Sequence, residues 1–69
     1  MDISFDREAD ALYIQFQTGK VKETIKLRDG LLIDIDKNGK IFGIEILDVS
    51  QRIPTKELGH VNIHLPMTA

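Results

Sequence analysis

Two groups of side chains in this sequence could bind a metal ion, provided that the backbone brings them together. The first is the string Asp34-Ile-Asp36-Lys-Asn38-Gly39 followed by Glu45, which fits the spacing D-x-[DN]-x-[DN]-G-x5-E of a calcium-binding loop. Asp34, Asp36, Asn38 and a bidentate Glu45 would supply the oxygen ligands. Such a loop lies between two helices, so the sequence on either side decides whether the ligands converge.

The second group is His60 and His64. Four residues apart on a helix, their side chains would lie within about 6 Å of each other. On a strand they would share a face but stand about 13 Å apart. Because Val61, Ile63 and Leu65 alternate with polar residues, the pattern favours a strand. We therefore predict that neither group binds a metal, and we expect no cofactor.

A third group, of acids and bases, could work with Tyr13 in acid–base catalysis. The predicted sheet sets Lys26 beside Asp34, and Arg28 near Glu45. Such clusters are more often cross-strand ion pairs, each contributing a fraction of a kcal/mol. No phosphate-binding loop and no nucleophile–histidine–acid pattern accompanies them. We predict no catalytic residues and favour a protein that is not an enzyme.

The composition narrows the classes of function. The 69 residues carry a net charge of −2 and include no cysteine. Thiolate metal sites, thiol catalysis and disulfides are therefore excluded. No basic patch is available to neutralise phosphates, and no apolar run has the roughly 18 residues of a membrane span. We expect a cytoplasmic protein that binds neither nucleic acid nor membrane.

The elements that must position these side chains are predicted to be strands. Turn-forming dipeptides recur about every ten residues, at Thr18-Gly19, Asp29-Gly30 and Asn38-Gly39, which is typical of hairpins. Between them apolar residues alternate with polar ones, as in half-buried strands. The alternating positions are Ile3, Phe5; Leu12, Ile14, Phe16; Val21, Ile25, Leu27; Leu31, Ile33, Ile35; and Phe42, Ile44, Ile46.

Each turn predicts a register, because a slip by one residue would turn a strand's apolar side chains to the wrong face. A two-residue loop at Asn38-Gly39 is favoured because both residues tolerate positive φ. The poorest predicted match sets Glu23 opposite Ile14. The predicted pairs are Ile33–Ile44, Leu31–Ile46 and Ile35–Phe42; Phe16–Val21 and Leu12–Ile25; Leu27–Ile33 and Ile25–Ile35; and Ile3–Ile14 with Phe5–Leu12.

The predicted fold is mainly β, or α+β: an antiparallel β-meander of four to five strands in one domain, residues 1–69. A short helical or turn segment follows, capped by Asp48 with Gln51 at the capping-box position and limited by Pro54. Residues 60–65 then form a late strand. Within this domain we expect residues 5–50 to form the core and residues 51–69 to cover one end of the apolar face.

Two stretches resemble a known family. They are Asp6-Arg-Glu-Ala-Asp-Ala-Leu-Tyr-Ile14 and the region Asp34–Leu47, with its Gly-Ile-Glu-Ile-Leu ending. Both are similar to motifs of the small bacterial and archaeal "domain of unknown function 2283", and the resemblance covers residues 5–50. It implies no activity or cofactor. It does imply an antitoxin-like role, since some relatives are encoded beside small toxin-like proteins.

The function expected from these observations is a protein–protein interaction module. The meander has more inward-facing apolar side chains than residues after Leu47 can cover, so association is the remaining means of stabilising so small a domain. We expect a homodimer or higher homo-oligomer, favouring a two-fold dimer with the same patch on both subunits. The same conclusion is favoured by the exposed apolar residues expected on the nominally polar face, Leu32, Ile41 and Leu47. The alternatives to self-association are that the C-terminal residues fold back and close a monomer, or that the patch binds a different protein. The alternative is a small enzyme, or a metal- or ligand-binding protein, that uses the polar sheet face.

Overall fold

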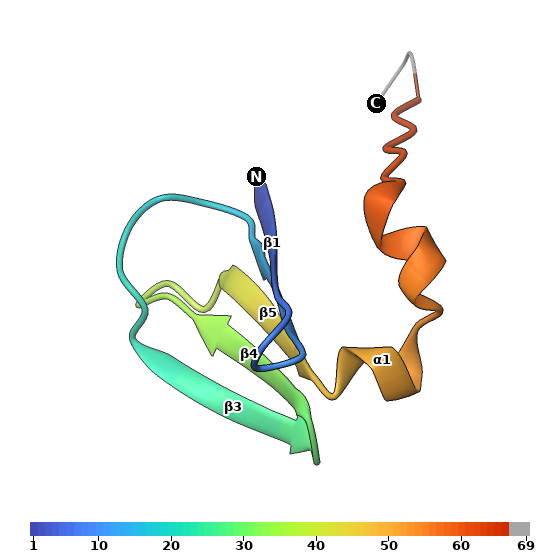
Figure 1. The fold of residues 1–69 in the computed structure, drawn as a ribbon. Helices are drawn as coiled ribbons and strands as arrows, with labels where there is room; N and C mark the ends of the chain where they lie inside the picture. Colours follow the sequence, from blue (N-terminus) through green and yellow to red (C-terminus); the bar gives the residue numbers. More distant parts are fainter. Residues whose placement is uncertain (67–69) are drawn as a thin grey trace.

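The computed structural model describes residues 1–66, so the last three residues of the predicted 51–69 cover segment lie outside the described part. Five antiparallel strands form one sheet, and a short α-helix and a 3₁₀ helix follow it (Figure 1). The mainly β prediction is therefore confirmed. The elements are β1 (Asp2–Asp6), β2 (Ala11–Gln15), β3 (Glu23–Arg28), β4 (Leu31–Ile35), β5 (Ile41–Leu47), α1 (Val49–Arg52) and η1 (Thr55–Gly59).

The strand order is β1-β2-β5-β4-β3, so the last strand lies at the centre of the sheet. The prediction of a hairpin at Thr18-Gly19, with Phe16 facing Val21 and Leu12 facing Ile25, is wrong. The chain instead leaves β2, crosses to the far edge and returns through β3 and β4. β5 then lies beside β2 and pairs with the whole length of β2.

Burial explains why β2 takes β5 as its partner. Ile14 faces Ile44, and Leu12 faces Ile46, whereas the predicted hairpin set Glu23 against Ile14. A charged side chain opposite a core isoleucine is a poor cross-strand match. The nonlocal pairing places apolar side chains together at both positions.

The β4–β5 hairpin follows its predicted register near the centre. Ile33 faces Ile44 and Leu31 faces Ile46, but Ile35 pairs with Ile41 instead of Phe42. The ladder shifts by one residue between Asp34 and Ile35, which leaves Phe42 as the extra residue of a bulge. The turn is also longer than predicted: Gly39 has φ +80° and its N–H donates to the Asp36 carbonyl.

The β3–β4 register differs from the prediction by two residues. Ile25 faces Ile33, not Ile35, and Leu27 lies at a bulge between Lys26 and Arg28. The bulge absorbs one residue next to the Asp29-Gly30 turn, which the three-residue loop did not anticipate. β1 and β2, by contrast, pair as predicted, with Ile3 facing Ile14 and Phe5 facing Leu12.

The helix α1 begins after Asp48, as predicted, but a different carboxylate caps it. Asp48 adopts a left-handed conformation with φ 53° and makes no side-chain cap. The carboxylate of Asp10, in the β1–β2 turn, accepts hydrogen bonds from the Ser50 N–H and Oγ, at 3.1 and 2.7 Å. Arg52 donates to the carbonyls of Leu47 and Asp29. These bonds tie α1 to two turns at one end of the sheet.

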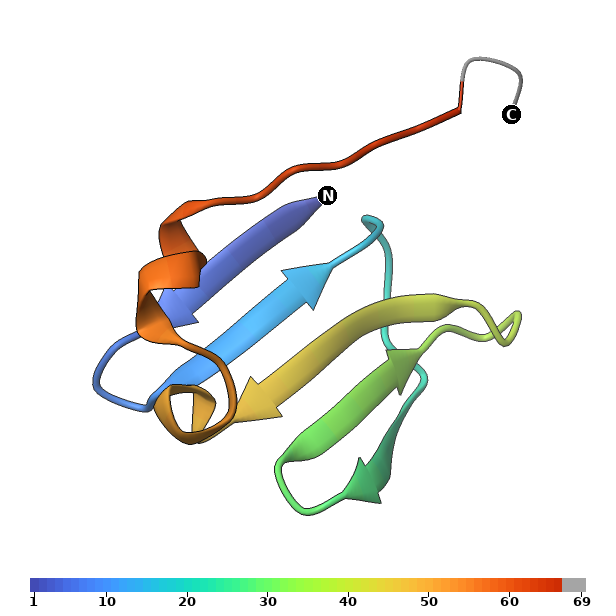
Figure 2. The ribbon, with the colours of Figure 1, turned by 90° about the vertical axis from the view of Figure 1, so that its right-hand side faces the viewer.

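After α1 the chain runs along one side of the sheet. η1 lies beyond the end of β1, and residues 60–65, here called the C-terminal segment, then run in the opposite direction to β1 (Figure 2). The segment is extended, as the late-strand prediction requires, but within residues 1–66 it belongs to no strand pair.

The two faces of the sheet differ in chemistry. Residues that face each other across a ladder share a side, so the pairs above define an apolar face formed by Ile3, Phe5, Leu12, Ile14, Ile25, Leu31, Ile33, Ile44 and Ile46. The polar face carries Ser4, Tyr13, Gln15, Thr24, Asp34, Gly43 and Glu45. Only three hydrophobic side chains in residues 1–66 are buried, namely Leu12, Phe42 and Val49, and of these Val49 alone is fully buried.

Candidate functional site

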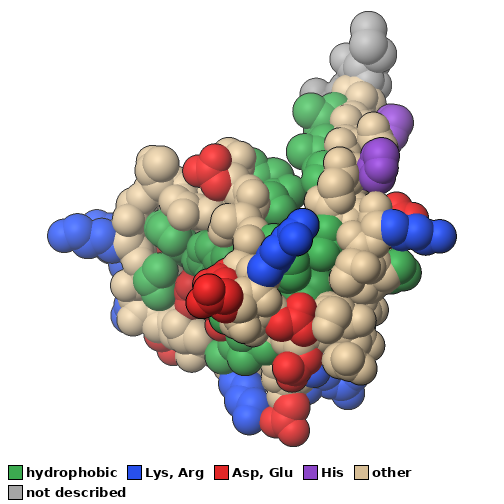
Figure 3. Space-filling view, viewed as in Figure 1, with side chains coloured by type: hydrophobic (Ala, Val, Ile, Leu, Met, Phe, Trp, Pro, Cys, Tyr) green, Lys and Arg blue, Asp and Glu red, His purple; other side chains and the backbone are tan. Residues whose placement is uncertain are grey.

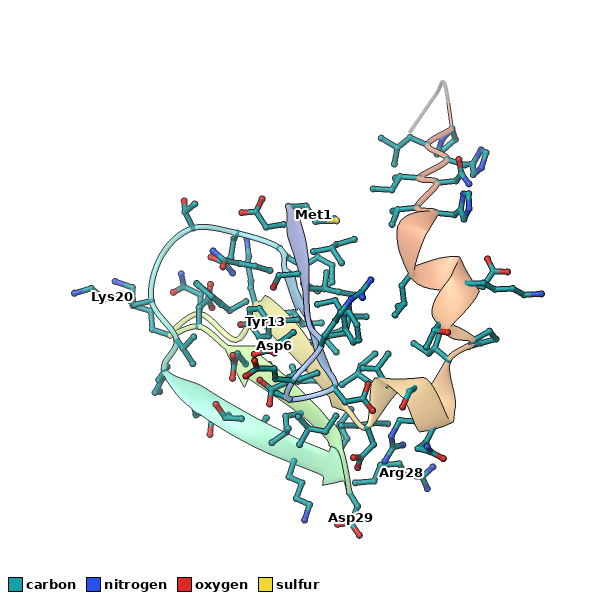
Figure 4. The ribbon with its side chains drawn as sticks, in the orientation of Figure 1. Met1, Asp6, Tyr13, Lys20, Arg28 and Asp29 are labelled. Carbon is teal, nitrogen blue, oxygen red and sulfur yellow. The ribbon has the colours of Figure 1, made fainter. Side chains whose placement is uncertain are left out.

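The polar face contains one cluster that spans three strands. Tyr13 on β2 donates a hydrogen bond of 2.7 Å from its hydroxyl to Asp34 Oδ2 on β4. Thr24 on β3 donates to the other carboxylate oxygen, Asp34 Oδ1, at 2.5 Å. Tyr13 lies on the side of the sheet away from the C-terminal segment (Figure 4). Both oxygens of Asp34 therefore have a protein donor.

Gly43 makes this contact possible. It lies on β5 opposite Asp34, between the strands that carry Tyr13 and Asp34. A Cβ atom on Gly43 would overlap the Tyr13 hydroxyl, lie 2.5 Å from Cζ of the ring and stand 2.9 Å from the Ile14 carbonyl oxygen. The phenol ring thus crosses β5 over a residue that has no side chain.

The environment of Tyr13 fixes its protonation state. Burial is the largest cause that raises its pKa to about 12, and the hydrogen bond to Asp34 and the negative charges of Asp34 and Glu45 add to it. Near neutral pH the hydroxyl is protonated and donates to Asp34. It therefore acts as a hydrogen-bond donor, because its proton is held more tightly than in a free phenol.

The predicted ion pair between Lys26 and Asp34 is wrong. Lys26 faces Leu32, and its ammonium group lies 2.9 Å from the Asp29 carboxylate on the exposed β3–β4 turn. Asp34 faces Thr24 instead, because the β3 register is shifted. Glu45 does lie near Tyr13, which it faces across the β2–β5 ladder, and it faces Leu32 on the other side.

Sequence reasoning missed Thr24 and Gly43 as members of this cluster. Gly43 offered a signal, since a glycine inside an alternating strand often marks the close approach of another group. Thr24 offered none, because its place beside Asp34 depends on the bulge in β3.

The calcium-type string is split between two environments, the polar face around Tyr13 and the β4–β5 turn. Strands, not helices, flank it on both sides, as the alternation predicted. Asp34 is engaged with Tyr13, whereas Asp36 Oδ1 accepts the backbone N–H groups of Asn38 and Lys40, each at 2.9 Å. The Lys40 bond is the main cause that lowers the pKa of Asp36, and a bond from Gln17 Nε2 adds to it.

The candidate metal ligands do not converge in the part of the chain that the structure describes. No group of three or more histidine, aspartate or glutamate side chains in residues 1–66 could hold an ion. His60 and His64 both project from the outer side of the C-terminal segment (Figure 3), as strand geometry requires. The absence of tight metal binding stays a prediction.

Two surface hollows lie away from Tyr13. One, of about 450 Å³, lies between the β2–β3 crossover and the β4–β5 turn, where its lining includes Lys20, Lys22 and Lys37. The other, of about 630 Å³, lies between β1 and η1 and is lined by Phe5, Arg7, Thr55, Lys56, Leu58 and Gly59. Neither contains Tyr13, Asp34 or Glu45.

The apolar face is the second candidate site. Ile3 on β1 and Ile25 on β3 are 41% and 42% exposed, and Phe5, Ile14, Ile33 and Ile44 are only partly covered. Hydrophobic side chains of the sheet and of the C-terminal segment face each other across an open space (Figure 3). Within residues 1–66, no helix is long and apolar enough to cross a bilayer.

Comparison with known proteins identifies the same family as the two sequence motifs, residues 6–14 and 34–47. The family described as "Protein of unknown function (DUF2283)" matches residues 2–50. An uncharacterized protein of Methanocaldococcus jannaschii is 45% identical over 49 residues, which are 71% of this chain and 41% of that protein. This chain thus spans less than half the length of that relative. No solved structure matches this chain. Residues 2–50 comprise all five strands, and the chain belongs to the DUF2283 family of proteins of unknown function.

Proposed function

We propose that this chain is a protein-interaction module whose apolar sheet face binds another protein chain, in the first instance a second copy of itself. The observation that carries the proposal is the half-exposed apolar face, on which Ile3 and Ile25 at the two sheet edges remain more than 40% exposed. Large apolar patches on soluble domains mark interaction sites. An antitoxin-like role of this chain, implied by the family resemblance, would be one case of such binding, with a small toxin-like protein as the partner.

The surface area supports a partner of substantial size. The chain exposes 5731 Å². A folded monomer of 7.8 kDa would expose about 4,400 Å². The excess of about 1,300 Å² is comparable to the area that each subunit of a stable dimer buries, which is about 800 Å² or more. The radius of gyration, 13.4 Å, also exceeds the roughly 11 Å of a compact chain of this length.

The alternative function uses the polar face as the site of an enzyme or of a metal- or ligand-binding protein. The polar cluster supports a structural role better, because Tyr13 and Thr24 already occupy both oxygens of Asp34. The two hollows are lined by other residues.

Sedimentation velocity at micromolar concentration tests the proposal. We expect a particle of twice the mass of the 7.8 kDa chain. Ile3→Asp should weaken the association, because it places a charge on the apolar face. Ser4→Asp is the matched control, since Ser4 is the next residue of β1 and points to the polar face. A monomer that is stable at all concentrations would refute self-association.

A further inference from the structure

The C-terminal segment has the pattern of a strand, but it pairs with no strand in the part of the chain that the structure describes. Val61, Ile63 and Leu65 are 58%, 62% and 80% exposed. Hydrophobic side chains of the segment lie on its side toward the sheet, whereas its histidines project outward (Figure 3). No backbone–backbone hydrogen bond within residues 1–66 involves residues 61–66. An extended segment with free backbone groups and one apolar side is suited to join a sheet.

The segment does not join its own sheet. It stands clear of β1 (Figure 1), and the hollow between Phe5 and Leu58 lies at the base of this space. Helix α1 fixes the path of the chain away from the sheet, because Asp10 and Arg52 bind it to two turns. The segment therefore occupies a second layer beside the sheet.

The orientation of the side chains matches a second layer. Two packed sheets lie about 10 Å apart, with strands aligned within about 30° and apolar side chains pointing into the space between them. The C-terminal segment runs along the line of β1 (Figure 2), and its apolar row points toward the apolar face. It has the direction and side-chain orientation of one strand of an opposing sheet, of which residues 1–66 supply no other strand.

We infer that a second copy of the chain supplies that opposing sheet, and that the C-terminal segment of each copy adds as a strand to a free edge of its partner's sheet. This inference rests on the proposed function, which requires only self-association. The second copy is the occupant indicated, because the excess area of about 1,300 Å² per chain fits a homodimer interface. A two-fold axis would use both segments and close the assembly.

The partner's sheet offers two edges for this addition. β1 and β3 each pair with one strand only, so each leaves one row of backbone groups free. Ile3 on β1 and Ile25 on β3 lie on the apolar face, where they would neighbour Ile63 of the added segment. His64 would point to the opposite face, toward solvent.

Cysteine cross-linking tests the arrangement, since the chain has no cysteine of its own. Chains with Ile63→Cys are mixed with differently tagged chains that carry Ile3→Cys or Ile25→Cys, and the mixture is oxidised. We expect a disulfide between the two kinds of chain with at least one of the edge variants. The matched control is His64→Cys, for which we expect no such product.

Two further outcomes separate this inference from the proposed function. A chain with both Ile3→Cys and Ile63→Cys that cross-links only within itself, in a particle that still has the mass of a dimer, would overturn the inference alone. A monomeric wild-type protein would overturn both. If the inference holds, Ile63→Asp raises the dissociation constant by about tenfold or more, whereas His64→Gln leaves it unchanged.

Discussion

Tyr13 on β2 and Asp34 on β4 are joined by a hydrogen bond of 2.7 Å, although β5 lies between their strands. The contact crosses a whole strand because Gly43 leaves room for the phenol ring. It links β2 to β4, which are not neighbours in the sheet, through residues that are 21 positions apart in the sequence. Its removal should therefore affect stability more than the loss of an ordinary surface hydrogen bond.

Gly43→Ala should destabilise the protein by about 1–3 kcal/mol, as expected for overpacking in a close contact. The added Cβ would displace the Tyr13 hydroxyl. Urea unfolding measures the effect. In a Tyr13→Ala background the same substitution should cost less, because only the Ile14 carbonyl remains close. Equal costs in both backgrounds would show that Gly43 does not serve the tyrosine.

Tyr13 is the only tyrosine, and no tryptophan is present, so its ionisation can be followed by ultraviolet absorbance. We expect titration near 12, not near the ordinary 10. Unfolded chains lose the phenol proton at lower pH than folded ones, so stability is fully present below 10 and falls as pH rises toward 12. Tyr13→Phe should remove this part of the alkaline decline. A phenol that titrates near 10 in the folded protein would contradict the burial described here.

Asp36 should contribute to stability with the opposite dependence on pH. Its lowered pKa, caused mainly by the Lys40 N–H, means that stability is present above the ordinary carboxyl pKa and is lost as pH falls through the lower folded value. Asp36→Asn should flatten the acid side of the stability curve below about pH 4. A stability curve of Asp36→Asn that keeps the wild-type slope below about pH 4 would refute the turn-capping role.

Gly39→Val should cost about 1–2 kcal/mol, because a β-branched residue resists the left-handed conformation with φ +80°. No atom lies within 4 Å of the added Cβ position, so the cost would come from the backbone alone. Gly39→Asn should cost less, since asparagine tolerates this conformation. Thermal melting compares the three proteins, and equal melting temperatures would refute the strain argument.

Calorimetric titration with calcium and with zinc should detect no tight site. The Asp36 carboxylate accepts a backbone N–H group of its own turn, and the Asp34 carboxylate accepts the hydroxyls of Tyr13 and Thr24. Binding a metal ion would therefore require these carboxylates to lose their present hydrogen bonds. A stoichiometric micromolar site that is lost in Glu45→Gln or His64→Ala would contradict this prediction and favour the alternative function.

Local pairings could be predicted from the sequence because turn chemistry limits the register. Asn38-Gly39 brought Ile33 opposite Ile44, and the short connection after Asp6 brought Ile3 opposite Ile14. The bulges at Phe42 and Leu27 could not be predicted, because alternation alone does not reveal an extra residue. The Tyr13–Asp34 contact was equally hidden, since it depends on which strands are neighbours.

The partner of β2 was the largest error, and it has a physical cause. An alternating strand is compatible with any other alternating strand, and the nearest hairpin is the simplest choice. Glu23 opposite Ile14 was the one local conflict in that choice. The observed pairing of Ile14 with Ile44 removes the conflict, but it joins residues that the sequence keeps far apart.

The strand order has a consequence for the folding kinetics. The β1–β2 hairpin and the β3–β4–β5 unit each contain only short-range pairings, and within residues 1–66 the β2–β5 ladder is the one strand pairing between these two units. Formation of the β2–β5 ladder therefore carries the main entropic cost of loop closure, and this ladder should form at or after the rate-limiting step. A truncation such as Leu12→Ala should slow refolding if the ladder exists in the transition state and should speed unfolding if it forms later. Stopped-flow kinetics would thus time the step at which the two units become one continuous sheet.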